Sequence, residues 1–145
     1  MTTADDRANS GQLDDPLDQL FVTGEVFDRQ LVADILSPYI RIYVEGGGVK
    51  IVFTQNAKLL GVREKLLAYL LAIKAVSLKD EGSPDSATPG DIEKETGLVG
   101  GTIRPILRRL LDEHLVTNIE SGRYTIPAYA LETIGQILKE RLDKA

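Results

Sequence analysis

Apolar side chains recur at helical spacing along three long stretches of the 145-residue chain. Residues 15–36 are predicted to form an amphipathic helix that Asp15 caps and that Gly24 interrupts. Over residues 56–78, leucines cover more than one face, which is typical of a helix at the centre of a hydrophobic core or of one partly buried by a partner. Residues 129–142 carry their leucines and isoleucine on one face, so this segment is predicted to be a third amphipathic helix.

A β-hairpin is predicted between the first two of these helices. Residues 40–44 and 49–53 are β-rich runs on either side of Glu45-Gly-Gly-Gly48. The glycines supply the positive φ angles that a tight turn needs. A phosphate-binding loop is the alternative, but no Lys-Ser/Thr pair follows Gly48 and the glycine spacing of dinucleotide-binding loops is absent.

The pattern from Thr88 to Gly97 predicts a short capped helix over residues 89–96. Thr88 is a good N-cap residue, Pro89 suits the first helical position, and Asp91 stands where a capping box places its acid. Gly97 follows at the position where helices commonly end on a left-handed residue.

A second helix is predicted over about residues 101–114, after the connection Leu98-Val-Gly100. At about 100° per residue, two opposite faces separate. The apolar face holds Ile103, Ile106, Leu107, Leu110 and Leu111, and the polar face holds Gly101, Arg104, Pro105, Arg108 and Asp112. We expect Pro105 to lie within the first turn, where amide hydrogens lack intrahelical partners. Asp112 is expected to pair with Arg108 or Arg109.

Residues 115–117 and 123–126 are predicted to be the strands of a second hairpin, with a turn between them. The order of elements therefore predicts a mainly α-helical α+β fold with small β-hairpins. The stretch from residue 80 to 87 is a loop by composition.

Charge is distributed unevenly along the chain, whose net charge is −5. Residues 1–40 hold eight acids and two bases, and residues 80–103 hold six acids and one base. Residues 41–79 hold seven bases and two acids, and residues 104–145 hold seven bases and six acids. The acidity is therefore concentrated in two stretches, and clustered bases elsewhere are compatible with phosphate binding.

Several classes of function find no support in the sequence. There is no cysteine and only one histidine, so disulfides, thiolate catalysis and cysteine-based zinc sites are excluded. His114 ends a leucine-rich helix and is interpreted as a helix-end or core residue. The carboxylates follow no metal-ligand pattern. We predict a non-enzymatic protein without a cofactor or metal. No apolar run is long enough to span a membrane and no secretory signal is evident, so a cytoplasmic location is expected.

The stretch from residue 88 to 126 resembles the winged helix-turn-helix regulators of bacteria and archaea, at the superfamily level of ArsR-like and MarR-like proteins. The resemblance lies in residues 88–97, residues 101–116 and Glu120-Ser-Gly-Arg-Tyr124. It covers about half of the chain and implies a winged helix-turn-helix domain over residues 54–127. Composition and periodicity add a disordered acidic tail (1–14), an N-terminal helix and hairpin (15–53), of which the hairpin lies outside the resemblance, and a C-terminal helix (128–145).

The resemblance implies a transcriptional regulator that inserts the helix near residues 101–114 into the major groove of duplex DNA. The residues that it places at the DNA are Gly100, Gly101, Thr102, Arg104, Pro105, Arg108 and, at the wing, Arg123. Arginine recognises guanine through two hydrogen bonds, and helix N-terminal amides hold phosphate. The structural alternatives are a solvated face for the two helix arginines, a helix-start role for Thr102 and a strand-flanking role for Arg123.

A homodimer through one or both flanking helices is also predicted, because such regulators commonly read paired half-sites. The alternative is that both helices pack on their own domain. A protein-protein interaction module without DNA binding is the competing function, since Asp91, Glu93 and Glu95 would repel phosphate. The sequence identifies no small-molecule effector and no target site.

Overall fold

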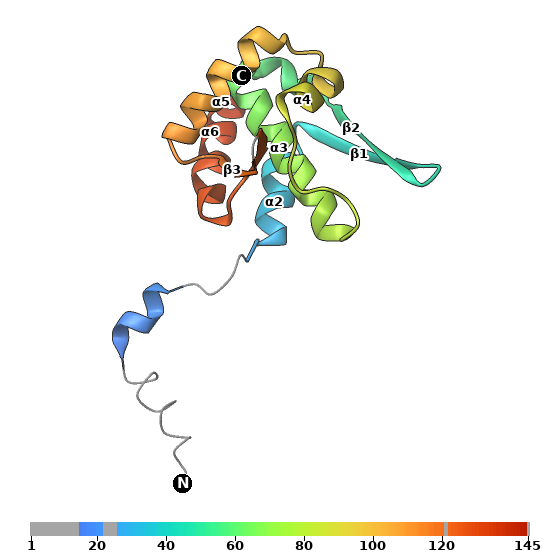
Figure 1. Cartoon of the computed structure of the whole chain (residues 1–145). Helices are drawn as coiled ribbons and strands as arrows, with labels where there is room; N and C mark the ends of the chain where they lie inside the picture. The colour runs from blue at the N-terminus through green and yellow to red at the C-terminus, as the bar shows by residue number, and fades with distance from the viewer. Residues whose placement is uncertain (1–14, 22–25, 121, 145) are drawn as a thin grey trace.

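The long helix α3 (Val62–Lys79) lies at the centre of the fold and contacts elements from both halves of the chain. The computed structural model describes residues 15–21, 26–120 and 122–144 (Figure 1). Helices and two separate antiparallel hairpins together make a mixed α+β fold. In chain order they are η1 (Pro16–Leu20), α2 (Arg29–Leu36), β1 (Ile40–Glu45), β2 (Gly48–Phe53), η2 (Gln55–Leu59), α3, α4 (Pro89–Thr96), α5 (Gly100–Asp112), β3 (Thr117–Glu120), β4 (Arg123–Thr125), η3 (Ala128–Ala130) and α6 (Leu131–Asp143).

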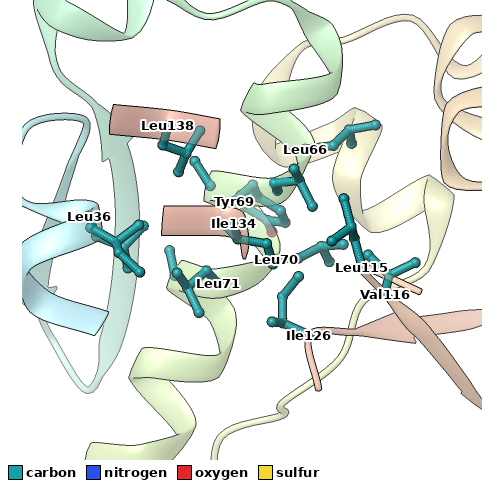
Figure 2. Packing of buried hydrophobic residues seen from close by; sticks show 14 of the residues in the cluster. Leu36, Leu66, Tyr69, Leu70, Leu71, Leu115, Val116, Ile126, Ile134 and Leu138 are labelled. Carbon is teal, nitrogen blue, oxygen red and sulfur yellow. The ribbon is translucent and has the colours of Figure 1, made fainter. Parts of the chain in front are cut away.

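The leucines of α3 form the middle of one continuous core. Four of them are completely buried, namely Leu66, Leu67, Leu70 and Leu71. Figure 2 shows their neighbours from α2 and α6 on one side and from the segment around Val116 on the other. The prediction of a central helix with leucines on several faces is therefore confirmed. The helix starts later than predicted, because a 3-10 turn (η2) precedes it and Gly61 is its N-cap.

The flanking helices α2 and α6 pack against α3 and against each other. α2 buries Val32, Ile35 and Leu36, and α6 buries Leu131, Ile134 and Leu138. A Cβ added at Gly135 of α6 would lie 2.9 Å from Cδ1 of Ile35, so this glycine permits the close approach. The apolar faces of α2 and α6, on which part of the dimer prediction relied, are thus covered within the chain itself, whereas Leu17, Leu20 and Phe21 of the predicted N-terminal helix are exposed.

The prediction of one interrupted helix over residues 15–36 is wrong in its extent. Asp15 caps only the short 3-10 helix η1, and α2 begins separately at Arg29, where the Asp28 carboxylate accepts a hydrogen bond from the Leu31 amide. Because Asp28 is a strong N-cap residue, it starts a new helix rather than continuing an old one. Gly24 and the predicted tail at residues 1–14 lie outside the described residues.

The hairpin β1–β2 forms as predicted, with residues Ile40 and Phe53 paired at its base. Gly46 and Gly47 have φ angles of +51° and +84°, so they form a tight turn as expected. The hairpin projects from the body of the fold (Figure 1). Residues opposite each other in an antiparallel pair lie on the same face. One face of this hairpin is therefore apolar along its length, from Ile40 to Val44 and back from Val49.

The second hairpin pairs β3 with β4. Its first strand begins at Thr117, two residues later than predicted. Leu115 and Val116, predicted to be strand, are buried core residues that precede β3. An isolated bridge between Ala87 and Tyr124 adds the loop before α4 to the open edge of β4.

The C-terminus of α5 ends in a Schellman motif with an unusual residue at its left-handed position. His114 has a φ of +62°, its amide donates to the Leu111 carbonyl at 3.0 Å, and the Leu115 amide donates to the Leu110 carbonyl at 2.9 Å. Glycine normally occupies this position, because a Cβ is strained there. The exposed His114 is therefore a helix-end residue, one of the two structural roles predicted for it.

We predict that His114→Gly stabilises the protein. Removing the Cβ relieves about 1–2 kcal/mol of left-handed strain, and glycine adds about 0.5–1 kcal/mol of chain entropy to the unfolded state. The free energy of unfolding should therefore rise by about 0.5–1 kcal/mol, as measured by urea denaturation. His114→Ala is the matched control, since it keeps the Cβ and should give no gain. Equal stabilities of the wild type, His114→Gly and His114→Ala would show that the backbone at His114 is not strained.

Candidate nucleic-acid interface

Helix α4 is held at both ends by the local bonds that its sequence predicts. The Asp91 amide donates to Thr88 Oγ1 at 3.0 Å, and the Thr88 amide donates to Asp91 Oδ2 at 3.2 Å. This reciprocal pair is a capping box. Gly97 ends the helix with a φ of +77°. Thr96 Oγ1 then accepts the Leu98 amide at 3.1 Å, which fixes the short connection to α5.

Helix α5 separates its residues into a buried face and an exposed face, as predicted. Ile103, Leu107 and Leu110 are buried against the core. Five of the seven residues predicted to contact DNA are exposed on the other side, namely Gly101, Thr102, Arg104, Pro105 and Arg108. Arg109 is exposed beside them, whereas Gly100 is half-buried. The structure therefore gathers most of the predicted site on one helix surface.

Pro105 lies one turn deeper in the helix than predicted. α5 begins at Gly100, so Pro105 occupies the second turn and is an interior proline. Proline has no amide hydrogen to donate to the carbonyl four residues earlier. The Gly101 carbonyl consequently lacks its usual helical partner, and Gly101 is exposed to solvent.

The three arginines of this face have no acidic partner among residues 15–21, 26–120 and 122–144. Arg104, Arg108 and Arg109 take part in none of the ion pairs there, which involve Arg63, Lys74 and Arg141. The predicted pairing of Asp112 with Arg108 or Arg109 is therefore not found. Arg104, Arg108 and Arg109, here called the arginine face of α5, therefore form a local cationic surface on an acidic protein.

An acid of α4 lies against the N-terminus of α5. A Cβ added at Gly100 would lie only 2.8 Å from Glu93 Oε1, so that carboxylate occupies the space beside the first helical residue. A carboxylate is favourable at a helix N-terminus, because it faces the positive end of the helix dipole. It also competes with a phosphate for the same place. The sequence suggested repulsion by Glu93, but its contact with Gly100 appears only in the fold.

Arg123 does not join the arginine face. Its Nε donates to Ser86 Oγ at 2.8 Å and its Nη2 donates to the Ser86 carbonyl at 2.9 Å. Ser86 itself is buried, and Thr125 Oγ1 donates to the neighbouring Asp85 carbonyl at 2.6 Å. The Arg123 side chain therefore ties β4 to the loop before α4. Nothing in the loop's composition signalled this contact, since the two residues are 37 positions apart.

Three further observations concern metal sites, membrane-spanning helices and similarity to known proteins. Within the part of the chain that the structure describes, no cluster of three or more His, Cys, Asp or Glu residues could hold a metal ion. None of the helices described is long and apolar enough to cross a membrane. Comparisons with protein-family models, with curated proteins and with solved structures found no match.

The acids of α4 also affect a buried tyrosine of α3. Burial, together with the smaller effect of the charges of Glu95 and Asp91, raises the pKa of Tyr69 to about 12. In the unfolded chain the tyrosine pKa is close to 10. Between these two values the folded protein keeps a proton that the unfolded chain has already released. The free energy of unfolding should therefore fall as pH rises from about 10 towards 12.

We predict that Tyr69→Phe reduces this loss of stability at high pH. The variant has no hydroxyl to ionise, so its stability relative to the wild type should improve as pH rises through this range. Urea denaturation followed by circular dichroism at about pH 8 and about pH 11 measures the difference. Tyr129→Phe, which removes an exposed hydroxyl, is the control. Parallel pH profiles for wild type and Tyr69→Phe would refute the prediction.

Proposed function

We propose that the chain is a winged helix-turn-helix protein that binds duplex DNA with α5 in the major groove. In this interpretation α3 is the first helix of the domain, α4 and α5 form the helix-turn-helix pair, and β3–β4 is the wing. The order of elements, the tight connection at Gly97 and the exposed polar face of α5 support it. A cytoplasmic transcriptional regulator is the role that this activity suggests.

The observation that carries the proposal is the arginine face of α5, whose guanidinium groups form no ion pair with any residue that the structure describes. Arg104 and Arg108 are one helical turn apart, so their guanidinium groups point the same way. Each has the hydrogen-bond geometry to recognise guanine O6 and N7, which is worth about 1–3 kcal/mol of base discrimination. Arg109 lies beside them, where it is placed to neutralise a backbone phosphate. A surface of this kind favours a polyanionic partner over a neutral one.

The acidic net charge does not oppose this interpretation, because the acids near the arginine face, with one exception, do not lie at the leading end of α5. Asp91 is engaged in the capping box of α4, and Asp112 is the first acid along the arginine face itself. Glu93 is the exception, since its carboxylate stands beside Gly100 at the leading end of α5. Arg123 is engaged with Ser86, so α5 rather than the wing is proposed as the main contact.

We predict that Arg104→Ala/Arg108→Ala abolishes DNA binding in moderate salt. Wild-type affinity for labelled duplex DNA should fall with salt, at a slope in log–log form of about −0.9 for each phosphate neutralised. On duplex of random sequence, where the two arginines lie against phosphates rather than guanines, the double variant should reduce the magnitude of that slope by about 1.8. Fluorescence anisotropy across a salt series measures both quantities.

Lys58→Ala/Lys139→Ala is the matched control for this experiment. It removes the same charge from two exposed lysines on η2 and α6, outside the arginine face. Its salt slope and affinity should stay close to those of the wild type. If both double variants weaken binding equally, then net charge rather than α5 controls the interaction and the proposed recognition helix is incorrect.

We also predict that Glu93→Gln increases DNA affinity severalfold. The substitution removes a negative charge beside the leading end of α5 while keeping the size of the side chain. The gain should be largest at low salt and should disappear at high salt, because the repulsion is electrostatic. Anisotropy titrations of the two proteins at two salt concentrations test this. Unchanged affinity would place Glu93 away from bound DNA.

A second function, protein-protein interaction, is favoured by exposed apolar residues near the same site. Val99, in the connection before α5, is 68% exposed, and Ile119 of β3 is 49% exposed. Apolar residues so exposed are more typical of a protein contact than of a phosphate contact. If the folded protein fails to bind DNA even at low salt, this alternative is preferred. Val99→Ser should then weaken the partner complex, whereas Arg104→Ala/Arg108→Ala should not.

A homodimer that reads two half-sites remains part of the proposal. Its interface would need a surface other than the apolar faces of α2 and α6, which are used within the chain. Sedimentation of the free protein and of its DNA complex gives the stoichiometry.

A further inference from the structure

An apolar groove lies between α2, β1 and the C-terminal end of α3, away from the arginine face of α5. Its volume is about 500 Å³, within the range of sites that bind ligands or peptide side chains. The apolar residues that line it are Val32, Ala33, Leu36, Ile40, Ile42, Ala75 and Leu78. Ile42 also lies on the apolar face of the projecting hairpin, so the groove continues onto that face.

The charged residues of the groove all have the same sign. Arg29, Arg41 and Lys79 line it, and no acid does. The arginines donate to nearby carbonyls, Arg29 to Leu78 and Arg41 to Ile40, but within the described ranges none of the three cations forms an ion pair. The groove is therefore both apolar and positively charged. A segment that combines acidic residues with exposed apolar side chains would suit it.

The segment Asp15–Phe21 of the same chain has this combination. Leu17 is 58% exposed, and Leu20 and Phe21 are each 75% exposed, so these apolar side chains are largely open to solvent. In a 3-10 helix, residues three apart lie above one another. Leu17 and Leu20 therefore form one stripe along η1, and Asp15 and Asp18 form another. The first 28 residues as a whole carry seven acids and one base.

The sequence distance between segment and groove allows the two to meet within one chain. Seven residues separate Phe21 from Arg29, and Arg29 itself lines the groove. Seven residues span up to roughly 25 Å when extended. A tether this short keeps the segment at an effective concentration of about millimolar, so weak contacts suffice for docking.

We propose that Asp15–Phe21 docks in this groove of its own chain. Leu17, Leu20 and Phe21 contact the apolar lining, and the carboxylates of Asp15 and Asp18 pair with the cations at the rim. Burial of three large apolar side chains is the driving force, and the charges select the site. The second groove, of about 340 Å³ between α2 and α6, suits this acidic segment less well, since Asp34 and Glu132 line it against a single cation, Lys139.

The test uses a nitroxide spin label on the segment and amide NMR spectra of the full-length protein. The chain has no cysteine, so Gln19→Cys gives a single labelling site on η1. Docking should broaden the amide signals of Ile42, Ala75 and Leu78 severalfold more than those of Gly135 and Gln136 in the second groove. Equal broadening at the two grooves, or none, would overturn the proposal.

Two variants show whether the predicted contacts are responsible. Leu17→Ser/Leu20→Ser changes only the segment, and Arg41→Glu/Lys79→Glu reverses two rim charges. Either should reduce the broadening at Ile42 and Ala75 severalfold. Lys58→Glu/Lys94→Glu, with the same charge change at two exposed lysines that line neither groove, should not. Broadening that survives both of the first two variants contradicts the proposed contacts.

A mixed sample establishes which chain the segment occupies. Isotope-labelled protein without nitroxide is mixed with unlabelled protein that carries the nitroxide. Docking within one chain leaves the observed spectra unbroadened, whereas broadening at the groove would place the segment on a second copy and overturn the proposal as stated. DNA binding plays no part in this experiment, so its outcome is independent of the function proposed above.

Discussion

Burial of α3 on every side is the constraint on which the rest of the structure depends. Its completely buried leucines contact α2 and α6 on one side and the α4–α5 region on the other. Replacing one such leucine by alanine typically costs about 2–5 kcal/mol, which is a large share of the stability of a domain this size. Each surrounding element packs its apolar side against α3, so its polar side faces solvent.

Two buried charges on α3 add specific connections to this apolar packing. Glu64 is 5% exposed; its carboxylate accepts the Gly61 amide at 2.7 Å and lies 3.4 Å from Arg141 of α6. Lys74 is 3% exposed; its ammonium lies 3.4 Å from Asp85 and 5.0 Å from the centre of the Phe27 ring. A buried charge is tolerated only with such partners. These contacts therefore fix how the C-terminal helix, the loop before α4 and the segment before α2 are placed around α3.

The arginine face of α5 follows from this placement. Because Ile103, Leu107 and Leu110 must face α3, the arginines between them are forced outward. The same packing brings α4 beside the start of α5, so that Glu93 reaches Gly100. The cationic face and the acid at its leading end are thus two results of one arrangement. The groove beside α2 lies at the other end of α3. Docking in this groove and binding by α5 can therefore be tested independently.

Local chemistry was sufficient to predict much of this protein from its sequence. The capping box of Thr88 and Asp91, the left-handed Gly97 and the glycine turn of the first hairpin involve residues within a few positions of each other. The periodicity of α5 likewise separated its buried and exposed residues. The tertiary structure decided the contacts between distant residues: Arg123 with Ser86, Glu93 with Gly100, and the packing of α2 against α6. Capping and periodicity act within one or two helical turns, whereas these contacts depend on how complete elements pack around α3.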